Sequence, residues 1–271
     1  KNVVSNGLVL DKNGQKMSKR LGNAVDPSDT LEKFGADATR WYMISNSNPW
    51  DNLKFDIDGV DEVRRKFLGT LYNTYSFFAL YANIDGFTYN EVEIDYKERP
   101  EMDRWIISEL NSLIETVDNF YNDYEPTKAA RAISEFVIEY LSNWYVRLSR
   151  RRFWKGEYEL DKISAYQTLY TVLLNVAKIS APIAPFFTDR LYQDLTKNIK
   201  DNKKMESVHL DAFPKIISSY IDKQLESKIN YAQRISSLTL SLRAKEKIKV
   251  RQPLNKIMVP VNNNEQKSQI E

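Results

Sequence analysis

Apolar residues recur every three to four positions along most of the chain, the spacing that places apolar side chains on one face of an α-helix. The longest stripes predict helices at 59–82, 101–121, 126–148, 160–179, 186–195 and 222–245. Asp26 followed by Pro27 is a helix-start signal and predicts a shorter helix that ends near Phe34, with another at 37–45. The pattern therefore predicts a mainly α fold.

The pattern also predicts which aromatic residues lie in the core. The stripe at 126–148 runs through Val137, Trp144 and Leu148, so we expect Trp144 to be buried. Trp50 and Phe55 lie in a polar link between two predicted helices. We expect both to anchor this link in the core, because exposed large aromatic residues are the exception.

Two short β-like runs lie near the ends of the chain. Val3, Val4 and residues 8–10 flank an Asn6-Gly7 turn signal and are predicted to form strands, as is the run at 257–261. Neither run has an obvious partner in the sequence, and the first residue is Lys1 rather than Met. We therefore expect the chain to be a piece of a larger protein.

Composition narrows the possible functions. The 271 residues include no cysteine and one histidine, His209, so disulfides and thiolate metal sites are excluded and we expect no bound structural metal. His209 has no second histidine or nucleophile beside it and is predicted to be structural. No apolar run is long enough for a membrane span, and no signal-peptide pattern opens the chain. These features favour a cytoplasmic protein that does not contact a membrane.

A small basic loop at 15–20 carries the first candidate chemistry. Lys16 and Lys19 flank Met17 and Ser18 just after an Asn-Gly turn signal at 13–14. Two ammonium groups and a hydroxyl on such a loop suit a polyphosphate, because they stabilise developing charge without forming a covalent bond. We predict that Lys16, Met17, Ser18 and Lys19 bind ATP; the alternative is a solvated surface loop.

A second basic stretch ends the helix that starts at 126. Its five cations fall within nine residues and alternate with aromatic side chains; the candidate RNA-binding residues are Arg147, Arg150, Arg151, Arg152, Trp154 and Lys155. Arginine forks suit phosphates, and an exposed tryptophan suits base stacking. The alternative is that these cations stabilise the end of the helix and pair with nearby carboxylates.

The basic loop stands in a longer motif that resembles a known family. The run Gly-Gln-Lys-Met-Ser-Lys-Arg-Leu-Gly-Asn at 14–23, followed by Val-Asp-Pro at 25–27 and Phe-Gly-Ala-Asp-Ala at 34–38, resembles the second signature of class I aminoacyl-tRNA synthetases. The resemblance implies that Lys16 and Lys19 are catalytic and stabilise the phosphates of ATP as the loop closes. The family's consensus ends in Ser where this chain has Arg20.

Three further stretches resemble the isoleucine-specific branch of this family: 47–56, 143–155 and the alternating cations at 243–251 before Gln-Pro-Leu. The resemblance implies a reaction of ATP, isoleucine and tRNA(Ile) that yields isoleucyl-tRNA(Ile), AMP and pyrophosphate, with Mg²⁺ accompanying ATP. It implies a monomer that binds no DNA. The valine, leucine and methionine branches are alternatives, and so is a free-standing helical RNA-binding module.

The same resemblance divides the chain into four segments. Residues 1–58 would form a small α+β stem-contact region that carries the basic loop, and 59–96 a long helix and a polar linker. Residues 97–246 would form an anticodon-binding α-helical bundle, and 247–271 the start of a further region. Arg64, Arg65 and Lys66 would either contact the tRNA acceptor stem or face water. Because the chain lacks a HIGH-type histidine motif, an amino-acid pocket and an editing domain, we expect it to be inactive alone.

Overall fold

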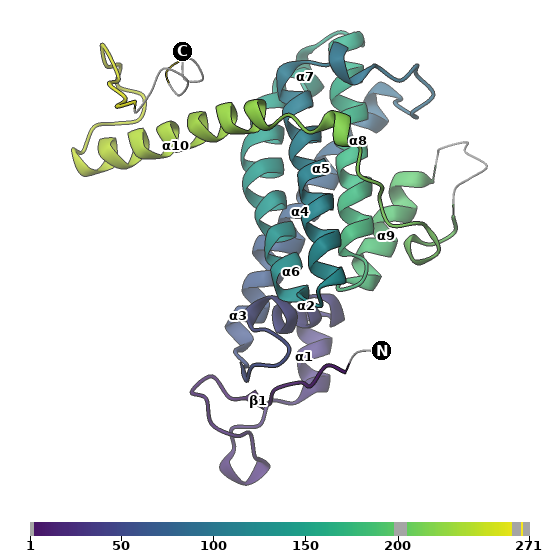
Figure 1. The fold of residues 1–271 in the computed structure, drawn as a ribbon, viewed down its shortest axis with the longest axis vertical. Coiled ribbons are helices and arrows are strands. Elements are labelled where there is room, and N and C mark those ends of the chain that lie inside the picture. Colours follow the sequence, from purple (N-terminus) through teal and green to yellow (C-terminus); the bar gives the residue numbers. More distant parts are fainter. Residues whose placement is uncertain (1–2, 198–204, 262–266, 268–271) are drawn as a thin grey trace.

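The computed structural model describes residues 3–197, 205–261 and 267, and these residues form a helical body with one two-stranded sheet (Figure 1). The predicted fold class, mainly α, is confirmed. The sheet and the first helices lie at one end of an elongated bundle, and the helix α10 extends sideways near the other end.

The first region is small and is built around short elements. Strand β1 (Val9–Leu10) pairs in parallel with β2 (Leu53–Lys54). Between them lie α1 (Pro27–Phe34) and α2 (Ala36–Asn46). The carboxylate of Asp26 accepts hydrogen bonds from the N–H groups of Ser28 and Asp29, so the predicted helix start is confirmed.

The bundle is built from long helices, two of which contain a π-helical segment. Helix α3 (Ile57–Val63) continues through the π-helical residues Arg64–Leu68 into α4 (Gly69–Asp85). Helix α6 (Pro126–Glu135) continues in the same way through Phe136–Val146 into α7 (Arg147–Lys155). The remaining helices are α5 (Glu101–Asn122), α8 (Leu160–Ser180), α9 (Pro185–Thr196) and α10 (Lys223–Lys245). Short 3₁₀ turns lie at Lys19–Leu21, Tyr96–Glu98, Val208–Leu210 and Ser218–Tyr220.

The core is continuous from the first region into the bundle. The rings of Trp41 and Phe67 stack with 4.1 Å between their centroids, and the indole N–H of Trp41 donates to Ser134 Oγ at 3.0 Å. Buried residues of α5, α6 and α8 belong to the same hydrophobic cluster as Trp41. The linker at 85–100 therefore joins two parts of one shared core, to which its own Phe87 belongs, and its predicted role as a domain boundary stays a prediction.

The π-helical segment at Phe136–Val146 changes which residues of its helix face the core. The buried positions there include Val137, Leu141 and Tyr145, each four residues from the last, together with Phe136 and Val146 beside them. Trp144 is only half-buried at the core edge and Leu148 is 56% exposed, so the predicted burial of these two residues was wrong. A period of 3.6 residues fails here because the π-helical hydrogen bonds join residues five apart and rotate the face.

Three other expectations were also wrong. Trp50 is 47% exposed, whereas Phe55 is buried as predicted. Residues 3 and 4 form no strand, since β1 is restricted to the two positions that find partners in β2. Residues 257–261 are also irregular, because no described strand lies beside them to complete a ladder.

Candidate functional site

The basic loop at 15–20 follows β1 and is held by one carboxylate. Asp11, which is buried, accepts hydrogen bonds from the N–H groups of Asn13 at 3.0 Å and Gln15 at 2.8 Å and from Asn23 Nδ2 at 2.9 Å. The bond from Gln15 and then that from Asn23 lower the pKa of Asp11 below its ordinary value, so the carboxylate stays ionised at neutral pH. Asn23 in turn accepts the N–H of Ser18 at 2.9 Å, which ties both ends of the loop together.

The four predicted ATP-binding residues lie together on this loop but differ in exposure. Lys16 and Lys19 are exposed, and neither ammonium group pairs with a carboxylate in the described part of the chain. Met17 is half-buried and packs against the core. Ser18 Oγ accepts the N–H of Arg20 at 3.2 Å and caps the short 3₁₀ turn. The loop therefore presents two free ammonium groups, and its binding of ATP stays a prediction.

Sequence reasoning assigned no role to Asp11 and Asn23, although both organise this loop. The signal was present, because an Asp two residues before an Asn-Gly turn is a common acceptor for turn N–H groups. Asn23 lies in the family motif but nine residues beyond Gly14 of the turn, and only the folded loop brings it back to Asp11.

The predicted RNA-binding residues of α7 fall into two groups. Five of them are exposed and pair with no carboxylate among the described residues; we call them the α7 face: Arg147, Arg150, Arg151, Trp154 and Lys155. Arg147, Arg151 and Trp154 follow one another at the spacing of a helical face. Trp154 is 48% exposed, so the face combines free cations with an accessible aromatic ring.

Arg152 points into the bundle instead. Its Nη1 and Nη2 donate to the two oxygens of Asp103 at 2.6 and 2.8 Å, and its Nε and Nη2 contact Asp161. Four of its five N–H donors have partners inside the protein. Burial opposes the charged guanidinium, but the hydrogen bonds and charge of Asp103 outweigh burial and raise the pKa of Arg152. A phosphate would have to displace these bonds, so RNA contact by Arg152 stays an untested prediction.

The carboxylate of Asp103 is the hub of this buried network. Asp103 is 0% exposed and also accepts the hydroxyl groups of Tyr145 at 2.9 Å and Ser164 at 2.6 Å. Because these partners come from the continuous helix that ends in α7 and from α8, the hub fixes the end of α7 relative to the bundle. No local pattern indicates this contact, since Asp103 and Arg152 are 49 positions apart.

The other cationic segment near the first region has partners of its own. Arg64 and Arg65 donate to Asp61, and Lys66 donates to Glu62, one helical turn away in each case. These short-range pairs favour the interpretation that the segment faces water. His209 Nε2 lies 3.2 Å from the carbonyl oxygen of Pro185, a structural contact of the kind expected for it.

Within the described residues, no group of three or more His, Cys, Asp or Glu side chains is placed to hold a metal ion. None of the described helices is long and apolar enough to cross a membrane.

Comparison with known proteins matches both regions of the chain. Residues 103–258, more than half of the chain, match the family model described as the anticodon-binding domain of tRNA ligase. The chain belongs to this family. Residues 1–56, which contain the basic loop, match the model described as tRNA synthetases class I (I, L, M and V). The anticodon-binding domain thus contains both the α7 face and α10.

Curated relatives match this chain along nearly its whole length. It is 65% identical to the isoleucine–tRNA ligase of Bacteroides thetaiotaomicron over 100% of this chain and 23% of that protein. It is 64% identical to the isoleucine–tRNA ligase of Porphyromonas gingivalis over 99% of this chain and 23% of that protein. The chain therefore spans about a quarter of the length of these relatives.

One solved structure shares the fold. The crystal structure of the ternary complex of Agrobacterium radiobacter K84 LeuRS with tRNA and LeuAMS covers 80% of this chain with a TM-score of 0.62. The match spans 24% of that protein at 22% sequence identity, so it supports the fold of the anticodon-binding domain and nothing finer.

Proposed function

We propose that the chain is a part of an isoleucine–tRNA ligase that contributes the ATP-closing loop and the anticodon-binding domain. The observation that carries the proposal is the similarity at 60–65% identity to isoleucine–tRNA ligases over nearly every residue of the chain. The whole protein would join isoleucine to tRNA(Ile) and convert ATP to AMP and pyrophosphate. It would act as a monomer in the cytoplasm.

In this proposal Lys16 and Lys19 stabilise the phosphates of ATP. Their ammonium groups are exposed on a loop whose ends are tied by Asp11 and Asn23, so the loop can approach the nucleotide as a unit. Charge that develops on the phosphates during amino-acid activation would be balanced by the two ammonium groups. Mg²⁺ would be held by the nucleotide, because ammonium groups suit phosphates and do not ligate cations.

The α7 face would bind tRNA. Guanidinium groups that have no partner in the protein keep all their donors for phosphate oxygens, and this describes Arg150 and Arg151 but not Arg152. The exposed ring of Trp154 would stack on an unpaired base. Arg147 and Lys155 would extend the same cationic surface along the helix.

The chain alone would not activate isoleucine. Positioning of both substrates supplies much of the rate in such a reaction, and the class I synthetase model matches residues 1–56 of this chain. The test is ATP–pyrophosphate exchange with the purified chain. We expect no exchange above background, and appreciable exchange that depends on isoleucine would contradict this part of the proposal.

The main test is binding of the chain to tRNA(Ile), tRNA(Val) and tRNA(Met) at low and moderate salt. We expect a preference for tRNA(Ile) and an affinity that falls as salt rises, because each phosphate contact releases counterions. A variant with R150Q and R151Q should bind more weakly and show a shallower salt dependence. Equal and weak binding of all three tRNAs, unchanged in this variant, would contradict the role of the α7 face.

A further inference from the structure

A second cationic surface lies at the far end of α10. Five cations alternate along residues 243–251, with a single carboxylate, Glu246, among them. Four of these cations are exposed and pair with no carboxylate in the described part of the chain; we call them the α10 turn: Lys245, Lys247, Lys249 and Arg251. By contrast, the exposed cations Arg64 to Lys66 are paired within their own helix.

The fifth cation holds the α10 turn in shape. Arg243 Nη1 donates to the carbonyl oxygens of Lys249 and Gln252, both at 2.9 Å. The N–H of Ile248 donates to the carbonyl of Arg243 at 2.8 Å. Arg243 therefore binds both sides of the turn, and the four remaining cations are displayed on an ordered backbone.

Lys247 occupies a position that ordinarily favours glycine. Its φ is +55°, and the bonds from Lys247 N–H to Ala244 O and from Ile248 N–H to Arg243 O form a Schellman motif at the end of α10. Glycine adopts this left-handed conformation without strain, whereas a lysine does so at a cost. Lys247 therefore keeps a strained conformation at an exposed position, and its ammonium group pairs with no carboxylate in the described part of the chain.

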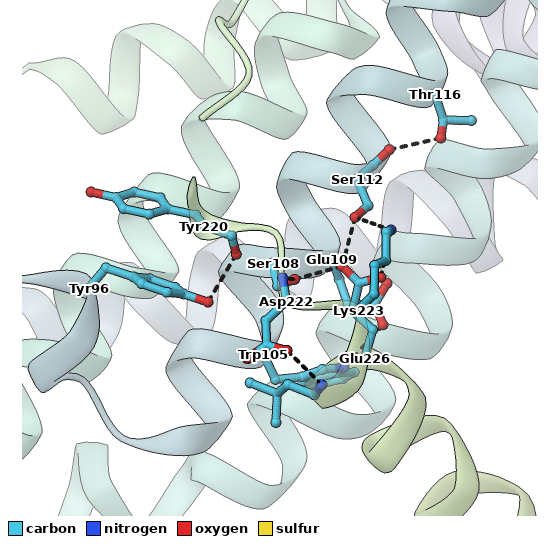
Figure 2. A network of polar contacts seen from close by, with 11 residues as sticks. Tyr96, Trp105, Ser108, Glu109, Ser112, Thr116, Tyr220, Asp222, Lys223 and Glu226 are labelled. Carbon is cyan, nitrogen blue, oxygen red and sulfur yellow. Dashed lines mark hydrogen bonds and ion pairs between the residues drawn. The ribbon is translucent and has the colours of Figure 1, made fainter. Parts of the chain in front are cut away.

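The start of α10 is fixed to α5 by a polar network (Figure 2). Glu226 Oε1 accepts the hydroxyl groups of Ser108 at 2.6 Å and Ser112 at 2.7 Å, and Lys223 Nζ bridges Ser112 and Glu226 at 2.8 Å each. Ser108 Oγ also accepts the N–H of Asp222 at 2.7 Å. This network sets the direction in which α10 leaves the bundle.

Beyond this polar network, α10 extends away from the bundle. Ile229 is its last buried residue, and the sixteen residues from there to Lys245 correspond to about 24 Å of helix. Figure 1 shows α10 extending sideways near the end of the bundle that carries α7. The α7 face and the α10 turn both depend on the first turns of α5, through Asp103 for α7 and Ser108 for α10. One helix therefore positions both cationic surfaces.

We propose that the α10 turn is a second phosphate-binding contact for RNA, which holds the backbone of the same molecule that the α7 face binds. This inference rests on the proposed tRNA binding. Lysine ammonium groups act as point charges on phosphates and read no base, so the contact adds affinity independently of sequence. The α7 face, with its arginine forks and Trp154, would account for any preference among RNAs.

The test compares the chain with a variant that carries K245Q, K247Q and K249Q. We expect this turn variant to bind tRNA(Ile) about 10-fold more weakly near 0.1 M salt. Affinity declines as salt rises, and this decline should be shallower in the turn variant. The magnitude of the slope of log affinity against log salt should decrease by about two, since each lost phosphate contact removes about 0.7 to 0.9 from it. The loss should be equal for tRNA(Ile) and tRNA(Val), because phosphates are common to both.

A charge-matched control separates this contact from net charge. The control carries K54Q, K97Q and K215Q, which are exposed lysines without a carboxylate partner in the described residues. We expect the control to bind within about 2-fold of the unmodified chain, and a turn variant with Arg at the three positions to retain binding. The K247G variant tests the turn itself: its Tm should be equal or higher while its affinity for RNA falls.

Two outcomes would overturn the inference, and they differ in whether the proposed function is overturned as well. If the turn variant binds tRNA(Ile) like the control, with the same salt slope, while R150Q and R151Q weaken binding, the α10 turn is not an RNA contact but the α7 face is. If the unmodified chain binds no tRNA under any of these conditions, the inference fails together with the proposed function.

Discussion

Arg152 and Asp103 form a bidentate ion pair at 2.6 and 2.8 Å that joins α7 to the start of α5 inside the bundle. The carboxylate is fully buried, and two hydroxyl groups satisfy its remaining acceptor capacity. A cation in the middle of an otherwise exposed basic helix is thus used to fix the helix, while its neighbours face outward. Arg152 thereby keeps α7 in one orientation, with the neighbouring arginines exposed.

The first prediction concerns the stability that this pair provides. Replacing Arg152 with Gln leaves the charge of Asp103 buried without its partner, which destabilises proteins by about 3–5 kcal/mol. We expect urea unfolding of R152Q to show a loss of this size. R151Q, one position away on the exposed side, should change the free energy of unfolding by less than about 0.5 kcal/mol. Equal stability of the two variants would contradict the assigned role of Arg152.

The second prediction tests the register imposed by the π-helical segment. Leu141 is buried and Leu148 is exposed, although both lie on the apolar stripe that a 3.6-residue period defines. Truncation of Leu141 to Ala should cost about 2–5 kcal/mol, whereas the same change at Leu148 should cost less than about 0.5 kcal/mol. Chemical denaturation of the two variants measures this difference. A large loss in L148A would favour an unbroken α-helical register.

Much of this fold follows from local sequence, and what does not has a physical reason. Helix positions follow from apolar spacing, and Asp26 with Pro27 defines the start of α1 because capping is a local interaction. The register of side chains after Glu135 does not follow from local sequence. The π-helical segment there depends on packing between helices, and the spacing of apolar residues does not reveal it. A period measured along the chain cannot detect it.

In the candidate site, too, some residues could be predicted from local sequence and others could not. The lysines of the basic loop and the exposed arginines of α7 were predicted from residue type and motif, since their chemistry needs only charge and exposure. The role of Arg152 depends on Asp103, which is distant in sequence, and the role of Arg243 depends on carbonyl groups of a folded turn. Residue type alone does not separate an arginine that binds protein from one that is free to bind RNA.

The third prediction concerns pH and the anchor of α10. Burial, followed by the charge of Glu226, raises the pKa of Glu109 to about 7 from 4.5, while the indole N–H of Trp105 donates to it at 3.1 Å. Lys223 of α10 and Glu135 of α6 also face this carboxyl group, with opposite effects on its charge. The folded protein therefore binds a proton more tightly at this site than the unfolded chain does.

The sign of the pH dependence follows from this difference. Because the folded-state pKa is the higher one, stability from protonated Glu109 is fully present below about pH 4.5 and is lost as pH rises to about 7. We expect E109Q, whose amide oxygen can still accept the Trp105 N–H, to be more stable than the unmodified chain at pH 8 by on the order of 2 kcal/mol. The two should be similar at pH 5. Urea unfolding across pH 5–8 measures this, and parallel curves for both proteins would contradict it.

The fourth prediction concerns the basic loop. Replacing Asn23 with Ala removes the acceptor for Ser18 N–H and the donor to Asp11, so we expect faster hydrogen exchange at Ser18 and Gln15 with little change in Tm. Thr39, a half-buried residue of α2, gives a control variant, T39A, that leaves the loop bonds intact. Unchanged exchange at both amides in N23A would show that Asn23 does not order the loop.

The fifth prediction separates stability from binding at Lys247. A lysine at φ +55° at the end of α10 carries a strain that glycine does not, so K247G should raise the free energy of unfolding by roughly 0.5–1 kcal/mol. A purely structural residue would gain stability with no other effect. If the ammonium group binds phosphate, the same variant should be more stable and bind tRNA less well.

Replacing Lys249 with Gly gives the control, because Lys249 has no positive φ and glycine there should only destabilise. Thermal unfolding and tRNA binding of the two variants decide the matter: a K247G variant that gains stability and keeps full affinity would mean that Lys247 serves no RNA contact.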